Sequence, residues 1–301
     1  MTPAVTIGLC VRNNASTIRE TIDSIIGQDC MHELMELIVV DGHSNDKTLS
    51  IIKDSLDNTS IKCRVFHENK GLGYARQIVV DNAEGTYIVW VDGDMVISKD
   101  YVGKQLEFMK CHPEVGIAKG KQALEPGKNL LATLETYSRA AGRMVDYTSE
   151  KAKSKSMGTS GCIYRVKATR QVGGFDKNIT GYGEDFDAEC RIRKAGWLLC
   201  TIDVQYHDYE RGRIFWKDLW RRYLKRGYDF QKVWHGKERV INLYKMLPPA
   251  AFVAGLFHSF KIYSLTHRKI AFLLPLQHMF KNTAWCIGFI QSSLDSHKTL
   301  T

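Results

Sequence analysis

The feature that most constrains the fold is an alternation of short apolar, β-rich runs with segments of helical periodicity in the first third of the chain. Four runs are expected to be strands, and three amphipathic segments between them are expected to be helices. The strands are Val5–Val11, Leu37–Val40, Cys63–Phe66 and Tyr87–Val91, and the helices are Ser16–Ile26, Thr48–Leu56 and Gly71–Asn82. This order predicts an α/β fold with a doubly wound, mostly parallel, Rossmann-like sheet.

Polar residues follow each expected strand. The segments are Arg12-Asn13, Asp41-Gly42, His67-Glu68-Asn69 and Asp92-Gly93-Asp94. In a parallel sheet the carboxyl ends of the strands share one edge, where ligands bind. Asp92 and Asp94, two residues apart beyond an apolar strand, are suited to sharing Mg²⁺ or Mn²⁺ with the phosphate oxygens of a substrate. The alternative for this pair is a polar turn without a ligand.

Several classes of protein are excluded by composition and by missing motifs. The chain is 44% hydrophobic and 25% charged, which excludes a disordered or collagen-like protein. It lacks the P-loop motif and a G-x-G-x-x-G turn after the first strand, so neither a P-loop NTPase site nor a dinucleotide-binding site is predicted. No two of the eight cysteines are closer than ten residues, which favours reduced thiols and the cytosol. The N-terminus has no basic segment before its apolar run, so a secretory signal is not expected.

The last third of the chain combines positive charge with apolar runs. Residues 211–239 contain ten Lys or Arg against three Asp or Glu, interleaved with aromatic residues. Three runs without charge follow at 246–260, 270–280 and 282–294. None reaches the roughly 18 residues of a membrane-spanning helix. This pattern predicts a helical extension that lies at a membrane interface; a helical subdomain with a basic face is the alternative.

Seven motifs follow one another in the first 230 residues, and together they resemble the family 2 glycosyltransferases, which have the GT-A fold. The first four are VTIGLCVRN at 5–13, ELIVVDGHSNDKT at 36–48, NKGLGYAR at 69–76 and AEGTYIVWVDGD at 83–94. The others are GCIYR at 161–165, VGGFD at 172–176 and GEDFD at 183–187, followed by RIRKAGW at 191–197. The resemblance implies inverting transfer of a sugar from a nucleotide-diphosphate donor, with Mn²⁺ or Mg²⁺.

The resemblance also assigns residues to the donor. Asp41 matches the aspartate that accepts a hydrogen bond from the donor base, and Arg76 matches the residue beside the base and the diphosphate. Asp92 is expected near the ribose or the metal. Arg12 and Asn13 are expected in the same donor site, although Cys-Val-Arg stands at 10–12 where relatives often carry Pro-Thr-Tyr.

The metal and catalytic positions follow from the same resemblance. Asp94, with Asp92, matches the DxD pair that binds the metal, and His207 matches a histidine that completes the metal site in many relatives. Glu184 and Asp185 match an acidic pair near the acceptor, in which the aspartate is usually the general base. An inverting displacement needs such a carboxylate to take the proton of the acceptor hydroxyl.

Four arginines near the basic segment have more than one interpretation. Arg211 and Arg213 are expected to reach the diphosphate, which suits the planar guanidinium group. Arg221 and Arg222 are placed either at the diphosphate or at lipid head groups, and the sequence does not separate the two.

The expected organisation is a catalytic domain over residues 1–210, with a nucleotide-binding half at 1–95 and an acceptor half at 96–210. Residues 211–301 form the membrane-interface region. The expected acceptor is a hydroxyl of a lipid-linked glycan at the cytoplasmic face of the cell membrane, and a polyprenyl phosphate is the alternative. The Gln-x-x-Arg-Trp signature of processive synthases is missing, so one sugar is expected per encounter.

Other classes of function were weighed against the transferase. A sugar nucleotidyltransferase usually has a glycine-rich loop after the first strand, and here that loop is Arg-Asn-Asn-Ala-Ser at 12–16. A basic module that binds nucleic acid or membrane without catalysis would explain the positive charge, but the basic segment adjoins apolar runs, so nucleic acid is not an expected partner. An inactive relative is disfavoured because Asp92, Asp94 and Asp185 are all present.

Overall fold

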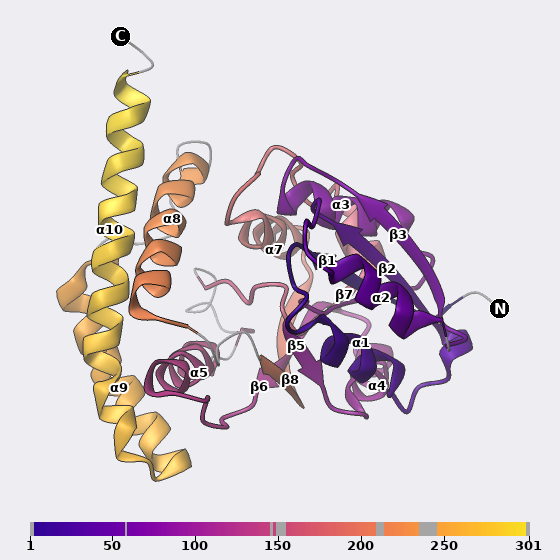
Figure 1. Cartoon of the computed structure of the whole chain (residues 1–301), viewed down its shortest axis with the longest axis horizontal. Coiled ribbons are helices and arrows are strands. Elements are labelled where there is room, and N and C mark those ends of the chain that lie inside the picture. The colour runs from indigo at the N-terminus through magenta and orange to yellow at the C-terminus, as the bar shows by residue number, and fades with distance from the viewer. Residues whose placement is uncertain are drawn as a thin grey trace. The chain divides into compact units, whose positions relative to one another are not determined.

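The computed structural model describes residues 3–57, 59–144, 147–148, 155–208, 214–234 and 246–298 (Figure 1). The chain divides into two compact units. The first comprises residues 1–122, 145–180 and 184–209, and the second comprises residues 123–144, 181–183 and 210–301. The second unit therefore includes a segment from the middle of the chain besides the C-terminal region.

One mixed eight-stranded sheet forms the centre of the first unit, in the order β3-β2-β1-β4-β7-β6-β8-β5. Its strands are β1 (Val5–Val11), β2 (Met35–Asp41), β3 (Lys62–His67), β4 (Tyr87–Trp90), β5 (Met95–Ile97), β6 (Val115–Gln122), β7 (Cys162–Arg165) and β8 (Leu198–Asp208). Strands β1 to β4 are parallel, as predicted. Strand β7 is antiparallel to both of its neighbours, and β5 is antiparallel to β8.

Helices cover both faces of this sheet, because alternate residues of its strands point to opposite sides. Val5, Ile7 and Leu9 of β1 belong to one apolar cluster, with residues of the helices α1 (Ile18–Ile26), α2 (Thr48–Leu56) and α4 (Tyr101–Cys111). Ile38 and Val40 of β2 belong to a second cluster, with residues of α3 (Leu72–Asn82), α6 (Val166–Gln171) and α7 (Glu184–Lys194). The predicted α/β, doubly wound architecture is confirmed.

Some element boundaries differ from the sequence prediction. Helix α1 begins at Ile18 rather than Ser16, because the N–H groups of Thr17 and Ile18 both donate to the carbonyl of Asn14 and form a turn first. A short 3-10 helix, η1 (His32–Leu34), precedes β2. Strand β8, which is not among the four strands expected in the first third of the chain, extends to Asp208, and its last residues pair with β5.

The second unit is built from helices (Figure 1). They are α5 (Leu130–Arg143), α8 (Trp216–Trp234), α9 (Pro248–Thr266), the 3-10 helix η5 (Lys269–Leu273) and α10 (Leu274–Lys298). Proline begins α9, and His267, with φ 54°, ends it. Among the described residues, none of the helices combines the length and the apolar character that a membrane crossing requires.

Two glycines bring α8 and α10 into close contact. A Cβ atom at Gly227 of α8 would collide with the carbonyl of Trp285, and one at Gly288 of α10 would collide with the carbonyl of Leu224. Only glycine permits so close an approach of two backbones. The two helices are therefore held in one defined crossing.

Buried polar groups join α5 to α10. Nζ of Lys281 lies 2.8 Å from Oε1 of Glu135 and 2.7 Å from Oγ of Ser138, and Gln277 donates to the same Glu135 oxygen at 2.9 Å. Burial alone would raise the pKa of Glu135, but the positive charges of Lys281 and Arg139 outweigh it and lower that pKa to about 2. Glu135 is therefore ionised inside the unit.

Candidate active site

The carboxyl ends of the parallel strands lie at one edge of the sheet. Val11 pairs with Asp41, and Asp41 pairs with His67, so β1, β2 and β3 end at the same level. Strand β4 pairs with β1 and leads directly into the turn that carries Asp92 and Asp94. Parallel strands lie about 5 Å apart, so β2 and β4, separated by β1, run about 10 Å from each other.

Asp41 is 1% exposed and anchors the loop that follows it. Its carboxylate accepts hydrogen bonds from the N–H and the hydroxyl of Ser44, the second at 2.5 Å, and Nδ1 of His67 lies 3.4 Å away. Asn13 donates its N–H to Oγ of Ser44 and accepts from the N–H of Asn45, both at 2.9 Å. These bonds hold the loops after β1 and β2 together, and base binding by Asp41 stays a prediction.

The other predicted donor residues differ in their surroundings. Arg12 is exposed at the end of β1, and its N–H donates to Oδ1 of Asn14 at 3.0 Å. Arg211 and Arg213 lie outside the described residues, so their predicted contact with the diphosphate is not addressed.

Arg76 of α3 and Glu184 of α7 form a buried ion pair, with 7% and 2% of the two residues exposed. Burial disfavours the charge of Arg76, but Glu184, Asp185 and Asp92 outweigh this effect and raise the pKa of Arg76 above its ordinary value. The structure therefore brings four of the predicted residues into one electrostatic group. Sequence reasoning did not pair Arg76 with Glu184, because 108 positions separate them.

A half-buried thiol, that of Cys10, lies beside this group. Burial raises the pKa of Cys10 to about 12; Arg76 opposes the shift, and Asp92, Glu68 and Glu184 add to it. Cys10 is therefore a neutral thiol near pH 7 and does not supply a nucleophile.

Asp92 and Asp94 are both half-buried, and the N–H of Met95 donates to the carbonyl of Asp92 at 3.0 Å to close the turn. Gly93 between them fits tightly, since a Cβ there would lie 2.9 Å from the side chain of Asn14. Val96 of β5 follows Asp94 by two positions, and it pairs with His207 of the antiparallel strand β8.

The described residues contain no group of three or more His, Cys, Asp or Glu side chains arranged to hold a metal ion. Two carboxylates in one turn nevertheless suit Mg²⁺ or Mn²⁺, which commonly take one or two carboxylates and complete their coordination with substrate phosphates and water. The donor set fits a metal that arrives with a diphosphate.

Asp185 occupies the first turn of α7 and is half-buried. Its Oδ1 accepts from the N–H of Phe186 at 2.7 Å. Gly158 lies beside its other oxygen, because a Cβ at Gly158 would be 3.4 Å from Oδ2 of Asp185, and the φ of Gly158 is 69°.

Glu189, one helical turn after Asp185, was missed by sequence reasoning. It is buried and accepts from the N–H groups of Met157 and Gly158 at 2.9 and 2.8 Å. Nζ of the buried Lys119 donates to the carbonyls of the same two residues at 2.5 and 3.0 Å. This arrangement, the 157–158 clamp, fixes the segment beside Asp185. Glu189 follows Asp185 by four positions, and this spacing could have indicated that the two acids lie on the same face of the helix.

Burial and the charge of Asp185 raise the pKa of Glu189 to about 7, although the hydrogen bonds from Met157 and Gly158 and the charge of Lys119 oppose the shift. A carboxylate beside a group with a raised pKa is a recurring arrangement at sites of acid–base chemistry.

Comparison with known proteins adds to this geometry. Residues 6–172, more than half of the chain, match the family described as glycosyl transferase family 2. An uncharacterized glycosyltransferase of Haemophilus influenzae is 33% identical over 108 residues, which are 36% of this chain and 42% of that protein. The chain thus spans less than half the length of this relative.

Two solved structures are similar in fold. The mannosyltransferase PcManGT from Pyrobaculum calidifontis, in complex with GDP-Man and Mn²⁺, has a TM-score of 0.67 and 17% identity over 98% of this chain and 88% of its own. TarS of S. aureus, in complex with UDP-GlcNAc, has a TM-score of 0.55 and 15% identity over 96% of this chain and 92% of its own. At these identities the likeness concerns the fold.

Proposed function

Because the chain belongs to glycosyl transferase family 2, we propose that it transfers one sugar, with inversion, from a nucleotide-diphosphate donor to a hydroxyl of a lipid-linked glycan. The observation that carries the proposal is the electrostatic group of Arg76, Asp92, Glu184 and Asp185 in the first unit. The donors in the two similar structures, GDP-Man and UDP-GlcNAc, support a nucleotide sugar as the donor class.

Asp185 is proposed as the general base. It takes the proton of the acceptor hydroxyl while the hydroxyl oxygen attacks the anomeric carbon, and the nucleoside diphosphate leaves from the opposite face. The bond from the anomeric carbon to the diphosphate oxygen breaks as the new glycosidic bond forms. The 157–158 clamp holds the backbone beside Asp185, so that the carboxylate has a fixed neighbour during the step.

The donor is proposed to lie along the strand ends, with Asp41 and Asn13 towards the base and Asp92 towards the ribose. Asp94, Asp92 and His207 would hold Mn²⁺ or Mg²⁺, which would neutralise charge on the leaving diphosphate. Arg76 is held by Glu184, so it contributes a fixed positive field near Asp92 rather than a mobile side chain. Arg12, Arg211 and Arg213 are proposed to reach the diphosphate.

The acceptor is proposed to be presented at a membrane, on its cytoplasmic face. Support comes from the exposed apolar side chains of the second unit, including Phe257 and Phe260 on α9 and Ile290 and Leu294 on α10. Large exposed apolar surfaces mark sites of interaction. The polyprenyl phosphate acceptor stays the alternative.

The test measures release of the nucleoside diphosphate from a panel of nucleotide sugars, with Mn²⁺ or Mg²⁺ and then with a chelator. The wild type is expected to release diphosphate slowly from one donor by hydrolysis, only with metal, and Asp94→Ala is expected to lose release. Asp185→Asn is expected to bind the donor in calorimetry but to release diphosphate at least about 100-fold more slowly, the scale of a lost general base.

Asp203→Asn is the matched control, since Asp203 is an exposed acid paired with Lys121 on the surface. If Asp185→Asn releases the nucleoside diphosphate as fast as the wild type when a lipid phosphate is the acceptor, the polyprenyl phosphate alternative is favoured, because a phosphate oxygen needs no base. Absence of donor binding and release in the folded wild type would overturn the proposed function.

A further inference from the structure

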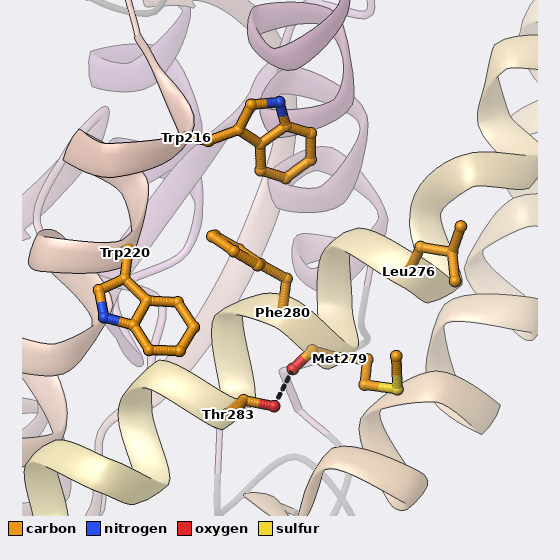
Figure 2. A pocket seen from close by; sticks show the side chains of 6 residues that line it. All are labelled: Trp216, Trp220, Leu276, Met279, Phe280 and Thr283. Carbon is orange, nitrogen blue, oxygen red and sulfur yellow. Dashed lines mark hydrogen bonds between the residues drawn. The ribbon is translucent and has the colours of Figure 1, made fainter.

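An apolar pocket lies between α8 and α10 in the second unit (Figure 2). Its volume is about 370 Å³, within the range of small-molecule sites. Two tryptophans of α8 and four residues of α10 line it: Trp216, Trp220, Leu276, Met279, Phe280 and Thr283.

The walls of the pocket are held in place by packing. Both tryptophan rings contact Phe280 with ring centroids 5.0 Å apart, Trp216 at 81° to its plane and Trp220 at 60°. Phe280 packs in turn against the buried cluster that includes Leu131 and Leu219. The glycine-mediated crossing of α8 and α10 fixes the separation of the two walls.

The lining presents almost no polar group to an occupant. The Thr283 hydroxyl donates to the carbonyl of Met279 at 2.9 Å, and Figure 2 shows the indole nitrogens of Trp216 and Trp220 turned away from Phe280. A sugar or a nucleotide would lose its hydrogen bonds to water here without replacement, which costs free energy. A hydrocarbon chain has no hydrogen bonds to water to lose, so the lining favours a hydrocarbon chain as the ligand.

Three exposed cations lie on α8, the helix that supplies the two tryptophans of the pocket. Lys217 and Arg221 each follow a pocket tryptophan by one position, and Lys225 continues the same row one turn later. All three are exposed, and none forms an ion pair with another residue in the part of the chain that the structure describes. We name this set the α8 cation row. An apolar cavity on a helix that also carries such a row is complementary to an amphiphile whose head group is negative.

We infer that the pocket binds one acyl chain of an anionic membrane phospholipid, whose phosphate lies against the α8 cation row. The inference rests on the proposed membrane association and adds to it a specific, saturable site. General insertion of exposed side chains needs a bilayer, whereas this site binds a single lipid molecule.

The test uses lipid monomers, without vesicles and without sugar transfer. Dioctanoyl phosphatidylglycerol, below its critical micelle concentration, is titrated into the full chain and followed by calorimetry and tryptophan fluorescence. One molecule per chain is expected to bind. Dioctanoyl phosphatidylcholine, with the same chains and no net charge, is expected to bind at least about tenfold more weakly, and inorganic phosphate is expected not to bind measurably.

Two sets of variants locate the site. Thr283→Phe fills the pocket, and Lys217→Glu with Arg221→Glu and Lys225→Glu reverses the α8 cation row. Each is expected to weaken phosphatidylglycerol binding at least about tenfold. Phe257→Ser, an exposed apolar residue outside the pocket, and Lys269→Glu, an exposed cation outside the row, are the matched controls and are expected to bind as the wild type does.

Circular dichroism checks that each variant folds, and Trp216→Ser, which changes an exposed wall residue, replaces Thr283→Phe if the latter does not. Absence of saturable monomer binding by the wild type, or unchanged binding in the folded pocket variants, overturns the inference. Equal binding of the two phospholipids overturns the role of the cation row. If vesicles still bind while monomers do not, the inference fails and the proposed membrane association stands.

Discussion

At the scale of single residues, the most consequential finding is that Glu184 and Asp185, adjacent in sequence, have different surroundings. Glu184 is buried against Arg76, whereas Asp185 is half-buried beside Gly158. Successive residues of a helix point about 100° apart, so one can enter the core while its neighbour stays partly exposed. The pair is therefore one structural acid and one candidate base.

Glu184→Gln is expected to lower the free energy of unfolding by about 3 kcal/mol, because it leaves the buried guanidinium of Arg76 without its nearest charge partner. Urea unfolding at pH 7 measures this change. Glu84→Gln removes an ion pair on the surface, with Lys62 at 2.7 Å, and is expected to leave stability nearly unchanged. Equal effects of the two substitutions would contradict the structural role of Glu184.

Glu189 predicts a pH dependence. Its pKa is about 7 in the folded protein against an ordinary value of 4.5, so the folded state binds the proton more tightly. Stability is therefore highest below about pH 4.5 as far as this group is concerned, and it falls as the pH rises towards 7. Glu189→Gln is expected to flatten the curve in this window.

Urea unfolding at intervals between pH 4.5 and 8 measures the slope. Glu20→Gln, at an exposed acid of α1, is the matched control and is expected to reproduce the wild-type curve. A slope that is unchanged in Glu189→Gln would show that the group does not titrate in this range.

At the scale of elements, the α5 helix is tied to α10 by the buried pair Glu135 and Lys281. The pKa of Glu135 is lowered to about 2, so the stability that this pair contributes is present above about pH 4.5. It is lost as the pH falls towards 2, where Glu135 takes up a proton. Acid should therefore loosen the contact between these two helices.

Lys281→Met is expected to cost about 3 kcal/mol at pH 7, because it leaves Glu135 ionised and buried. The double variant Glu135→Leu and Lys281→Met is expected to recover most of the loss, because no unpaired charge remains. Hydrogen exchange of the α5 and α10 amides locates the effect in the second unit. Failure of the double variant to recover would show that the pair also positions the helices.

At the scale of the whole molecule, the second unit exposes apolar side chains on α9 and α10. Phe257 is 72% exposed and Phe260 is 64% exposed. With a net charge of +9, the chain is expected to bind anionic vesicles more tightly than neutral ones, and less tightly at high salt. Phe257→Ser with Phe260→Ser is expected to weaken this binding by about tenfold or more.

Vesicle flotation measures this partition. Val65→Ser is the matched control, because Val65 is 48% exposed but belongs to β3 of the first unit. Equal losses for the control and for the two phenylalanines would refute insertion through α9. Binding that is insensitive to all of these substitutions would place the contact elsewhere in the chain.

The sequence by itself determined the first four strands and the helices between them, and it located the polar segments that follow these strands. These features depend on local periodicity and on turn residues close together in the chain. Only the tertiary structure decided the pairing of Arg76 with Glu184, the 157–158 clamp held by Glu189 and the inclusion of α5 with the C-terminal helices. Their partners are 108, 32 and up to 146 positions apart. Such pairings depend on how whole elements pack, because the pattern within a helix fixes which face is buried but not which distant segment covers it.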